Sequence, residues 1–225
     1  YHSMKQNTWF DPFFIFENLS EEDKLIQKNV KQFCNAELRP NVVKYNHEHF
    51  FDKELYKEFG NLGVLGSTIK NYGGAAASNT AYGLINYEIE KVDSSYRSSI
   101  SVQSSLVIHP INEFGSEEQK NYYLPDLISG KKIGCFGLTE SEAGSDPSSM
   151  KTTYSKQKDG YVLNGSKNWI TNSPIADVFI IWALNEKHEA NSIKGFILNK
   201  GMKGLSTQSI ENKTSLKISP TGQII

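Results

Sequence analysis

The sequence has little cysteine and no long apolar run, and each shortage excludes a class of protein. Its 225 residues include two cysteines, Cys34 and Cys135, which lie far apart and outside any CxxC motif. This usage excludes a zinc knuckle and a disulfide-stapled scaffold. The longest unbroken apolar run covers residues 178–184, far short of the roughly 20 residues that a membrane-spanning helix needs. The sequence therefore predicts no transmembrane segment.

The chain also lacks an excess of charge of either sign. It has 24 Lys and Arg residues against 25 Asp and Glu residues, a formal net charge of −1. Electrostatics therefore gives no reason to expect a nucleic-acid or anionic-membrane partner. No GxGxxG, Walker or HExxH motif is present, which removes the usual signals of nucleotide-binding and zinc-dependent enzymes. His47 and His49 flank Glu48 without a third ligand, so no metal site is predicted.

The first half of the chain has the pattern of helices. Ser20, Ser78 and Ser116 each precede apolar residues at helical spacing, and a serine side chain is a favourable N-cap. Asp52 is predicted to cap a further short helix that Gly60 ends. The first half should therefore be a helical unit.

The second half has short runs of aromatic and β-branched residues, typical of strands. Asn164-Gly165 lies between two such runs and predicts a hairpin. Residues 178–183 and 195–198 are predicted strands that are buried on at least one face. Short strands joined by Gly, Asn and Lys turns indicate an antiparallel barrel or sandwich. Residues 221–225 also have a strand pattern, and a chain that ends there leaves an unpaired edge, so we expect this chain to be incomplete.

Two segments stand out chemically. In residues 134–147 a predicted strand is followed by a loop with Thr, Ser and Gly. Its N–H groups and hydroxyls suit the polar edge of a heteroaromatic ring or a pyrophosphate, and an acidic turn is the alternative. In the second segment, Trp169 offers an aromatic plane, and Thr171 places a hydroxyl two residues on, on the same strand face. The alternative for Trp169 is core packing.

Together the two segments resemble the flavin-binding signature of the acyl-CoA dehydrogenase family. That signature is a strand ending in Leu-Thr-Glu, a loop closing on Gly-Ser-Asp, and a later Trp-Ile-Thr. The resemblance covers nearly the whole chain and, within the family, is greatest to the glutaryl-CoA dehydrogenases. It rests on residues 92–98, 101–107, 135–140 and 169–174.

The resemblance implies an α+β fold that is truncated relative to the family. An N-terminal all-helical domain at residues 1–132 precedes an antiparallel β-barrel or sandwich middle domain at residues 133–225, incomplete at its C-terminal end. The family's C-terminal four-helix domain would be missing. FAD would lie between the middle and C-terminal domains. By position, the implied cofactor-binding residues are Phe136, Gly137, Leu138, Thr139, Gly144, Ser145, Trp169, Ile170 and Thr171.

The same resemblance implies a substrate site around Arg97. In the glutaryl-CoA subfamily an arginine and a serine at the positions of Arg97 and Ser98 meet the distal carboxylate of the substrate. A guanidinium suits a planar carboxylate because it can donate two parallel hydrogen bonds. Glu90 would orient the guanidinium, and Ser145 would lie where thioester and flavin meet. The alternative for Arg97 is an exposed ion pair with Asp93.

The implied activity is the oxidative decarboxylation of glutaryl-CoA to crotonyl-CoA and CO2, a step of lysine and tryptophan degradation. The family's catalytic base is a glutamate of the C-terminal domain and has no counterpart here, so the chain as given should be inactive. Residues 141–143 are Ser-Glu-Ala where Pro-Asn-Ser is expected in that subfamily. Three alternatives stay open: a non-decarboxylating short- or branched-chain acyl-CoA dehydrogenase, an acyl-CoA oxidase, and a non-catalytic fragment of a truncated gene model.

Partners and location follow from the resemblance alone. They are an acyl-CoA substrate, with glutaryl-CoA favoured, an electron-transferring flavoprotein, and further copies of the chain in a homotetramer. The expected location is the mitochondrial matrix if the source is eukaryotic and the cytoplasm if it is bacterial.

Overall fold

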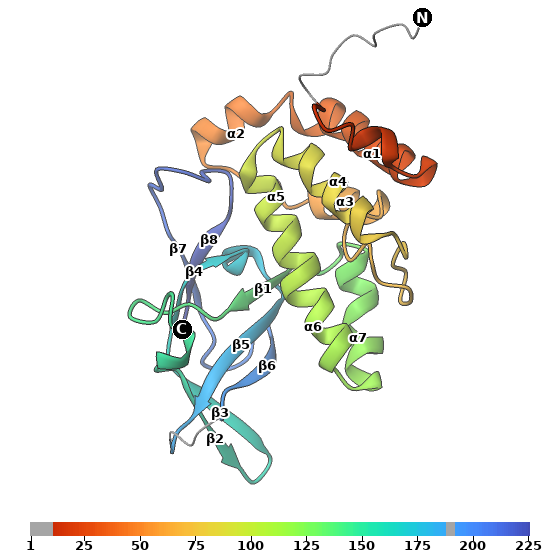
Figure 1. Cartoon of the computed structure of the whole chain (residues 1–225). Coiled ribbons are helices and arrows are strands. Elements are labelled where there is room, and N and C mark those ends of the chain that lie inside the picture. The colour runs from red at the N-terminus through yellow and green to blue at the C-terminus, as the bar shows by residue number, and fades with distance from the viewer. Residues whose placement is uncertain (1–10, 188–191) are drawn as a thin grey trace, which may run out of the picture.

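The computed structural model describes residues 11–187 and 192–225, with the helices on one side and the strands on the other (Figure 1). The α-helices of these residues are α1 (Glu21–Phe33), α2 (Val42–Glu48), α3 (Leu55–Asn61), α4 (Asn79–Glu90), α5 (Ser94–Ser101), α6 (His109–Phe114) and α7 (Glu117–Ile128). The strands are β1 (Gly134–Gly137), β2 (Thr153–Gln157), β3 (Gly160–Asn164), β4 (Lys167–Thr171), β5 (Val178–Asn185), β6 (Lys194–Asn199), β7 (Thr207–Ser209) and β8 (Thr221–Ile224). This order confirms the predicted α+β class.

Serine side chains begin three of the helices, as the sequence predicts. Ser20, Ser78 and Ser116 each accept a hydrogen bond from the backbone N–H three residues further along, at the starts of α1, α4 and α7. Each bond satisfies an N–H group that has no partner within the first turn. These helix starts are therefore encoded by a few neighbouring residues.

The predicted bounds of α3 are wrong at both ends. The helix begins at Leu55 with Glu54 as its N-cap, while Asp52 accepts the N–H of Glu54 at 3.0 Å in the preceding turn. Gly60 lies inside the helix, where a Cβ atom would lie 2.2 Å from the carbonyl oxygen of Ser129. Glycine at this position therefore allows close packing against the end of α7 and does not end the helix.

The strands form two sheets, and the larger sheet is mixed. β1 pairs with residues 178–181 of β5, and β2 pairs with residues 184–185, both in parallel. β6 runs antiparallel along residues 178–183, and β3 completes this sheet by pairing with β2. β4, β8 and β7 form a smaller antiparallel sheet. The sheets pack as an open sandwich, so the barrel alternative is wrong and the antiparallel prediction holds only in part.

The predicted hairpin at Asn164-Gly165 is wrong. The strands on either side belong to different sheets, because β3 pairs with β2 and β4 pairs with β8. A Cβ atom at Gly165 would lie 2.5 Å from the hydroxyl oxygen of Thr152, so glycine here permits two chain segments to approach closely. The hairpin instead joins β2 to β3 through Lys158 and Asp159. The next residue is a glycine, and Asp-Gly is itself a hairpin signal.

β8 is the central strand of the smaller sheet. It pairs with β4 on one edge and with β7 on the other. The prediction of a strand at this point is confirmed. The expectation that it leaves an unpaired edge is wrong, because both of its edges carry a partner.

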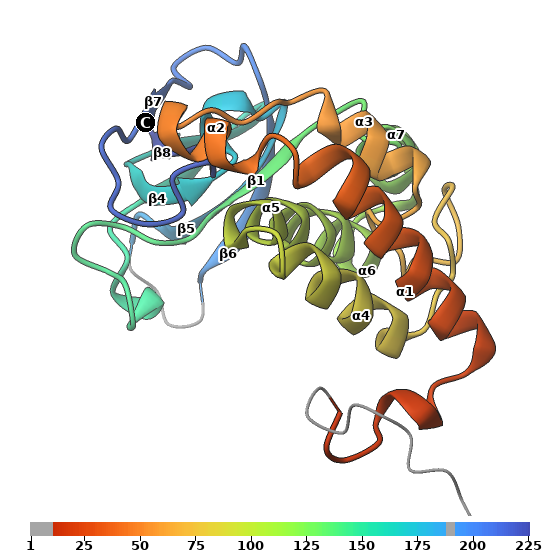
Figure 2. The same ribbon diagram turned by 90° about the horizontal axis from the view of Figure 1, so that it is seen from above.

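Apolar packing joins the helices to the strands. The larger core combines residues from α1 to α7 with Val178, Ile180 and Ile218, and α1 lies along α4 on its outer side (Figure 2). It therefore crosses the predicted domain boundary between residues 132 and 133. A smaller core lies between the two sheets. Its members are Cys135, Ile170, Ala176, Phe179, Ile181 and Ile224.

Two buried amide side chains connect the helices to β1. Gln103, in a π-helical turn before α6, accepts the N–H of Gly134 at 2.7 Å. It also donates to the carbonyl oxygens of Leu127 and Lys132, both at 2.9 Å. Asn172 donates to the carbonyl of Gly134 at 3.1 Å. Both amides are fully buried, so no solvent competes for these bonds, and they set where β1 begins.

Neither a membrane span nor a metal cluster occurs among the residues that the structure describes. No helix within residues 11–187 or 192–225 is long and apolar enough to cross a bilayer. Over the same residues, no three His, Cys, Asp or Glu side chains gather closely enough to hold a metal ion. His47 and His49 lie at the end of α2, outside any such group.

Candidate functional site

The strand that carries Trp169 is irregular at this residue. The register of β4 against β8 shifts between Lys167 and Ile170, which marks a β-bulge. Trp169 has a φ angle of +61°, a left-handed conformation that is strained for a bulky side chain. The bulge interrupts the regular alternation of β4, so a spacing of two residues does not by itself decide whether Trp169 and Thr171 share a face. Trp169 is 58% exposed, so the core-packing alternative for it is wrong.

The loop after β1 is hydrogen-bonded to this bulge. The backbone N–H of Asn168 donates to the carbonyl of Thr139 at 2.9 Å. The Asn168 side chain donates to the hydroxyl of Ser141 at 3.3 Å and accepts the N–H of Trp169 at 3.0 Å. Trp169 and the loop therefore lie side by side, although they are far apart in the sequence.

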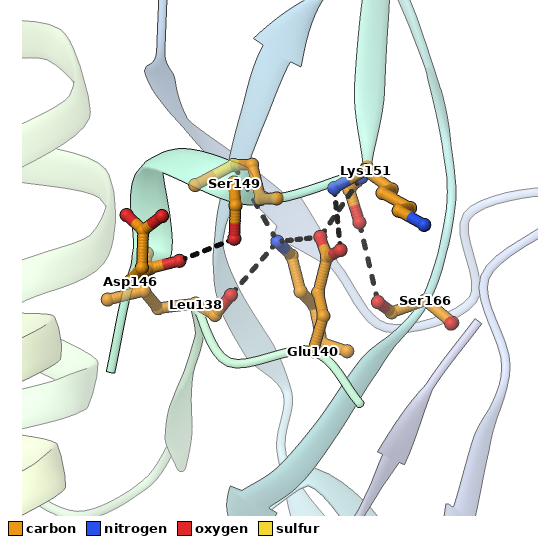
Figure 3. A network of polar contacts seen from close by, with 9 residues as sticks. Leu138, Glu140, Asp146, Ser149, Lys151 and Ser166 are labelled. Carbon is orange, nitrogen blue, oxygen red and sulfur yellow. Dashed lines mark hydrogen bonds and ion pairs between the residues drawn. The ribbon is translucent and has the colours of Figure 1, made fainter. Parts of the chain in front are cut away.

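Lys167 and Glu140 form a buried ion pair at the base of the loop. The Lys167 Nζ atom lies 2.7 Å from Glu140 Oε1, and the two side chains are 1% and 8% exposed. The Nζ atom also donates to the carbonyl of Leu138 at 3.1 Å. The Glu140 carboxylate accepts the backbone N–H groups of Lys151 at 2.7 Å and Thr152 at 3.0 Å (Figure 3). One carboxylate thus closes the intervening loop.

The ion pair determines the protonation state of Glu140. Burial acts to raise the pKa of this carboxyl group, but hydrogen bonds from Lys167, Thr152 and Lys151 outweigh it and lower the pKa to about 2. Burial lowers the pKa of the Lys167 ammonium group, and Glu140 opposes that shift. Glu140 is therefore a fully engaged carboxylate at neutral pH, which does not suit it to take a proton from a substrate.

The loop residues predicted to bind ligands lie at the surface. Gly144 and Ser145 are exposed, and no atom lies within 4 Å of a Cβ position built at Gly144. Within the described part of the chain, the hydroxyls of Thr139, Ser145 and Thr171 make no hydrogen bond. An exposed indole beside unbonded hydroxyls is a surface that fits a flat heteroaromatic ligand with a polar edge.

Arg97 belongs to a second polar cluster, on α4 and α5. Its Nε atom donates to Glu90 at 2.7 Å, and its Nη1 atom lies 3.4 Å from the hydroxyl of Ser101. The Arg97 and Glu90 side chains are 38% and 43% exposed. Hydrogen bonds from Arg97 and Ser94 lower the pKa of Glu90. The proposed pairing of Arg97 with Asp93 is wrong, because Asp93 instead caps the start of α5.

A buried amide connects this cluster to the strand with the bulge. Asn172, the residue after Thr171, donates to the carbonyl of Ser99 at 3.3 Å. Ser99 lies two residues after Arg97 on α5. The end of β4 and the middle of α5 are therefore in direct contact, and the two predicted binding regions lie in adjoining elements.

Two family models match the chain over most of its length. The model described as "Acyl-CoA dehydrogenase, N-terminal domain" matches residues 20–131. The model described as "Acyl-CoA dehydrogenase, middle domain" matches residues 135–225. The chain belongs to the acyl-CoA dehydrogenase family.

Three acyl-CoA dehydrogenases illustrate the relationship. A short-chain-specific enzyme of Clostridium acetobutylicum is 36% identical over 210 residues, which cover 92% of this chain and 55% of that protein. Mitochondrial isovaleryl-CoA dehydrogenase of Pongo abelii is 37% identical, with 92% and 50% covered. The crystal structure of a glutaryl-CoA dehydrogenase from Mycobacterium smegmatis in complex with FADH2 is similar with a TM-score of 0.91 and 41% identity, with 95% and 54% covered. The chain spans about half the length of these relatives.

Three residues predicted to bind the acyl-CoA dehydrogenase cofactor are more enclosed than the loop and the bulge. Phe136 packs its ring edge against Trp182, with 6.0 Å between ring centroids. Gly137 is buried, and a Cβ atom there would lie 2.6 Å from Ile181 Cδ1. Ile170 is buried in the core between the sheets. Gly137 and Ile170 can contribute to a site only through their backbone groups, because both residues are buried.

Sequence reasoning assigns no role to Lys167 or Asn172, although both connect parts of this candidate site. Each is a buried polar side chain, whereas lysine and asparagine are mostly exposed in proteins. Their positions next to the Trp-Ile-Thr segment indicate a role only weakly, because the sequence does not show their hydrogen-bond partners. Those partners, near Leu138 and Gly134, are distant in the sequence.

Proposed function

We propose that this chain forms the flavin-facing part of an FAD-dependent acyl-CoA dehydrogenase. The observation that carries the proposal is the exposed indole of Trp169, held in a left-handed conformation beside a loop rich in hydroxyls. A strained backbone that turns an aromatic ring toward solvent persists where function requires it. Glu140 is not placed as the catalytic base, since it is held in its ion pair with Lys167.

The residues present fit FAD. Its isoalloxazine ring has apolar faces, which suit the Trp169 indole, and an edge of nitrogen and oxygen atoms. The backbone groups of Leu138 and the hydroxyls of Thr139 and Thr171 suit that edge. The relative from M. smegmatis is described in complex with FADH2, which supports the same cofactor here.

Bound FAD supplies the redox chemistry, the acceptance of a hydride from the acyl thioester. The chain's own residues bind and orient. Trp169 would pack against the ring, Thr171 would donate a hydrogen bond near its redox-active nitrogen, and the loop with Gly144 and Ser145 would hold the thioester end of the substrate. An electron-transferring flavoprotein as electron acceptor and a homotetrameric assembly are part of the same proposal.

Within this function we propose glutaryl-CoA as the substrate, which is oxidised and decarboxylated to crotonyl-CoA. Arg97 carries the specificity, because a guanidinium binds a carboxylate through two parallel hydrogen bonds. Its Nε group donates to Glu90 and its Nη1 group to Ser101, which fixes the guanidinium and leaves the Nη2 group for a ligand. Ser98 lies next to Arg97 on α5 and is partly exposed. The 41% identity to a glutaryl-CoA dehydrogenase supports this choice.

A non-decarboxylating short-chain acyl-CoA dehydrogenase is the second candidate. The 36% identity to the short-chain-specific enzyme of C. acetobutylicum favours it. In that case Arg97 keeps Glu90 and Ser101 as its partners, and no substrate carboxylate is bound.

The first test is the visible absorption spectrum of the purified chain after incubation with FAD and desalting. We expect a retained flavin band that Trp169→Ala weakens. Phe114→Ala is the matched control, because Phe114 is an exposed aromatic residue on α6, 86% exposed. A colourless wild-type protein contradicts the proposal that this chain forms the site.

The second test is titration of the flavin-loaded protein with glutaryl-CoA and with butyryl-CoA, followed by the change in the flavin spectrum. We expect Arg97→Met to abolish a preference for glutaryl-CoA. Lys91→Met, which removes an exposed cation at the end of α4, should leave the preference intact. Unchanged discrimination in Arg97→Met favours the short-chain candidate.

A further inference from the structure

Lys167 and Glu140 connect the two segments that the proposed function assigns to the flavin. We propose that they are a positioning pair, which holds the loop after β1 and the bulge of β4 in one fixed relation. Both side chains are buried, so their role is to hold the two segments and not to present a binding group at the surface. The identity of the ligand rests on the proposed function, whereas the connection between the two segments is a property of this chain.

The pair is anchored firmly on the strand side. The backbone of Lys167 is opposite Ile224 of β8, the last pairing in register before the bulge. Its side chain then passes under the loop, where Nζ bonds to the carbonyl of Leu138 and to Glu140. Trp169 follows two residues later. The side chain of Lys167 therefore determines how the Trp169 bulge sits against the strand end at Leu138.

Glu140 holds the loop after β1 in place. It accepts the N–H groups of Lys151 and Thr152 and thereby closes residues 141–150 into a loop. Within that loop Ala143 and Met150 are buried, and the other side chains are exposed. A segment with so little apolar burial is held mainly by its hydrogen bonds. The position of Ser145 thus depends on the Glu140 carboxylate.

The chemistry of the pair is better suited to positioning the two segments than to stabilising the fold. A buried ion pair contributes little net stability, because desolvation offsets the attraction. Charge-assisted hydrogen bonds are short and directional, and these two groups distribute them among four named points: the Leu138 carbonyl, the Lys151 and Thr152 N–H groups, and each other. An apolar pair of equal volume would fill the same space without fixing those points.

The test compares Lys167→Met with Lys213→Met as a matched control. Lys213 is a partly buried lysine of the strand region, and its Nζ atom donates to the carbonyl of Leu216 at 2.8 Å and to Thr221. It holds a different loop, next to β8, and does not contact residues 138–152. The second variant is the double substitution Glu140→Gln with Lys167→Met, which stays folded more readily because it leaves no buried charge unpaired.

The first measurement is amide hydrogen exchange of the chain without added flavin. The N–H groups of Thr152 and Asn168 bond to Glu140 and to the Thr139 carbonyl. We expect both to exchange at least about tenfold faster in Lys167→Met and in the double variant, because the charge-assisted bonds of the pair then no longer hold the two segments that carry these groups. Amides of β5 serve as the internal reference in the double variant, which leaves no buried charge unpaired, and there they should change far less. Equal acceleration of all amides in the double variant, or a change no larger than in Lys213→Met, overturns the proposal.

The second measurement is the dissociation constant for FAD, from quenching of flavin fluorescence. We expect a rise of about tenfold in Lys167→Met and in the double variant, and a smaller rise in Lys213→Met. The double variant should regain thermal stability without regaining affinity, which a purely structural role does not predict. Affinity restored together with stability overturns the proposal.

The two measurements separate this inference from the proposed function. A wild-type chain that binds no FAD contradicts the proposed function for this chain, while local acceleration at Thr152 and Asn168 still supports the positioning pair. A wild-type chain that binds FAD, with Lys167→Met unchanged in both measurements, overturns the positioning pair and leaves the proposed function standing.

Discussion

Two ion pairs in the candidate site have the same length and different surroundings. Lys167 lies 2.7 Å from Glu140, and Arg97 lies 2.7 Å from Glu90. The first pair has side chains 1% and 8% exposed, and the second has side chains 38% and 43% exposed. A buried charge that loses its partner has no water to replace it, whereas an exposed charge does. The first pair is therefore suited to hold structure, and the second is suited to accept a ligand in place of a partner.

The largest expected effect is the loss of stability in Lys167→Met. Removal of one partner leaves the Glu140 carboxylate buried and unpaired, which costs about 3–5 kcal/mol of unfolding free energy. Urea denaturation followed by far-ultraviolet circular dichroism measures this loss. A decrease no larger than that of Arg97→Met would remove the distinction between the two pairs.

Acid should destabilise the protein mainly through the buried pair. The pKa of Glu140 is lowered from its ordinary 4.5 to about 2, despite burial, by bonds from Lys167, Thr152 and Lys151. A lowered pKa contributes stability that is present above pH 4.5 and is lost as the pH falls toward 2. We expect Glu140→Gln to flatten the dependence of the urea midpoint on pH in this window more than Glu90→Gln does. Equal flattening by the two substitutions would contradict the comparison.

Gly165→Ala should disturb the buried pair without changing a charge. The new Cβ atom would lie 2.5 Å from the hydroxyl oxygen of Thr152, whose N–H group bonds to Glu140. We expect a loss of about 1–3 kcal/mol from this overpacking, measured by thermal unfolding. Gly83→Ala is the control, because Gly83 lies within α4 with no atom within 4 Å of its Cβ position. It should be neutral or stabilise the helix by up to about 1 kcal/mol.

The smallest expected effect is the stability change in Arg97→Met. Exposed ion pairs contribute about 0–1 kcal/mol, and salt screens them. The difference from wild type in urea should therefore be small and should shrink further in high salt, whereas that of Lys167→Met should persist. A large, salt-independent loss in Arg97→Met would place the Arg97–Glu90 pair in the same class as the buried one.

Local signals predicted the fold wherever neighbouring residues decide the conformation. The serine caps at Ser20, Ser78 and Ser116 bond only three residues ahead, so they are readable from the sequence. The prediction of a hairpin at Asn164-Gly165 is wrong because a glycine can permit either a tight turn or a close approach of two chain segments. Gly165 permits a close approach, to Thr152 of another segment. The prediction that Gly60 ends a helix is wrong for the same reason, because Gly60 permits a close approach to Ser129 at the C-terminal end of α7.

The candidate site divides in the same way. The motif around residues 134–147 predicted the loop of the candidate site. The Trp-Ile-Thr segment predicted Trp169. The bulge that exposes Trp169 could not be predicted, because it depends on how β4 pairs with β8. The role of Lys167 could not be predicted from the sequence either, since a lysine in a strand is ordinarily exposed.

The sequence by itself determined the order of helices and strands, the family, and the residues that the proposed function assigns to a flavin and a carboxylate. These properties depend on short periodic patterns and on motifs within a few residues. Only the tertiary structure decided which ion pair is buried, which glycine permits a close contact, and which aromatic ring faces solvent. Those properties arise because long-range packing removes water from some polar groups and leaves it around others, and that removal decides the energetic role of each charge.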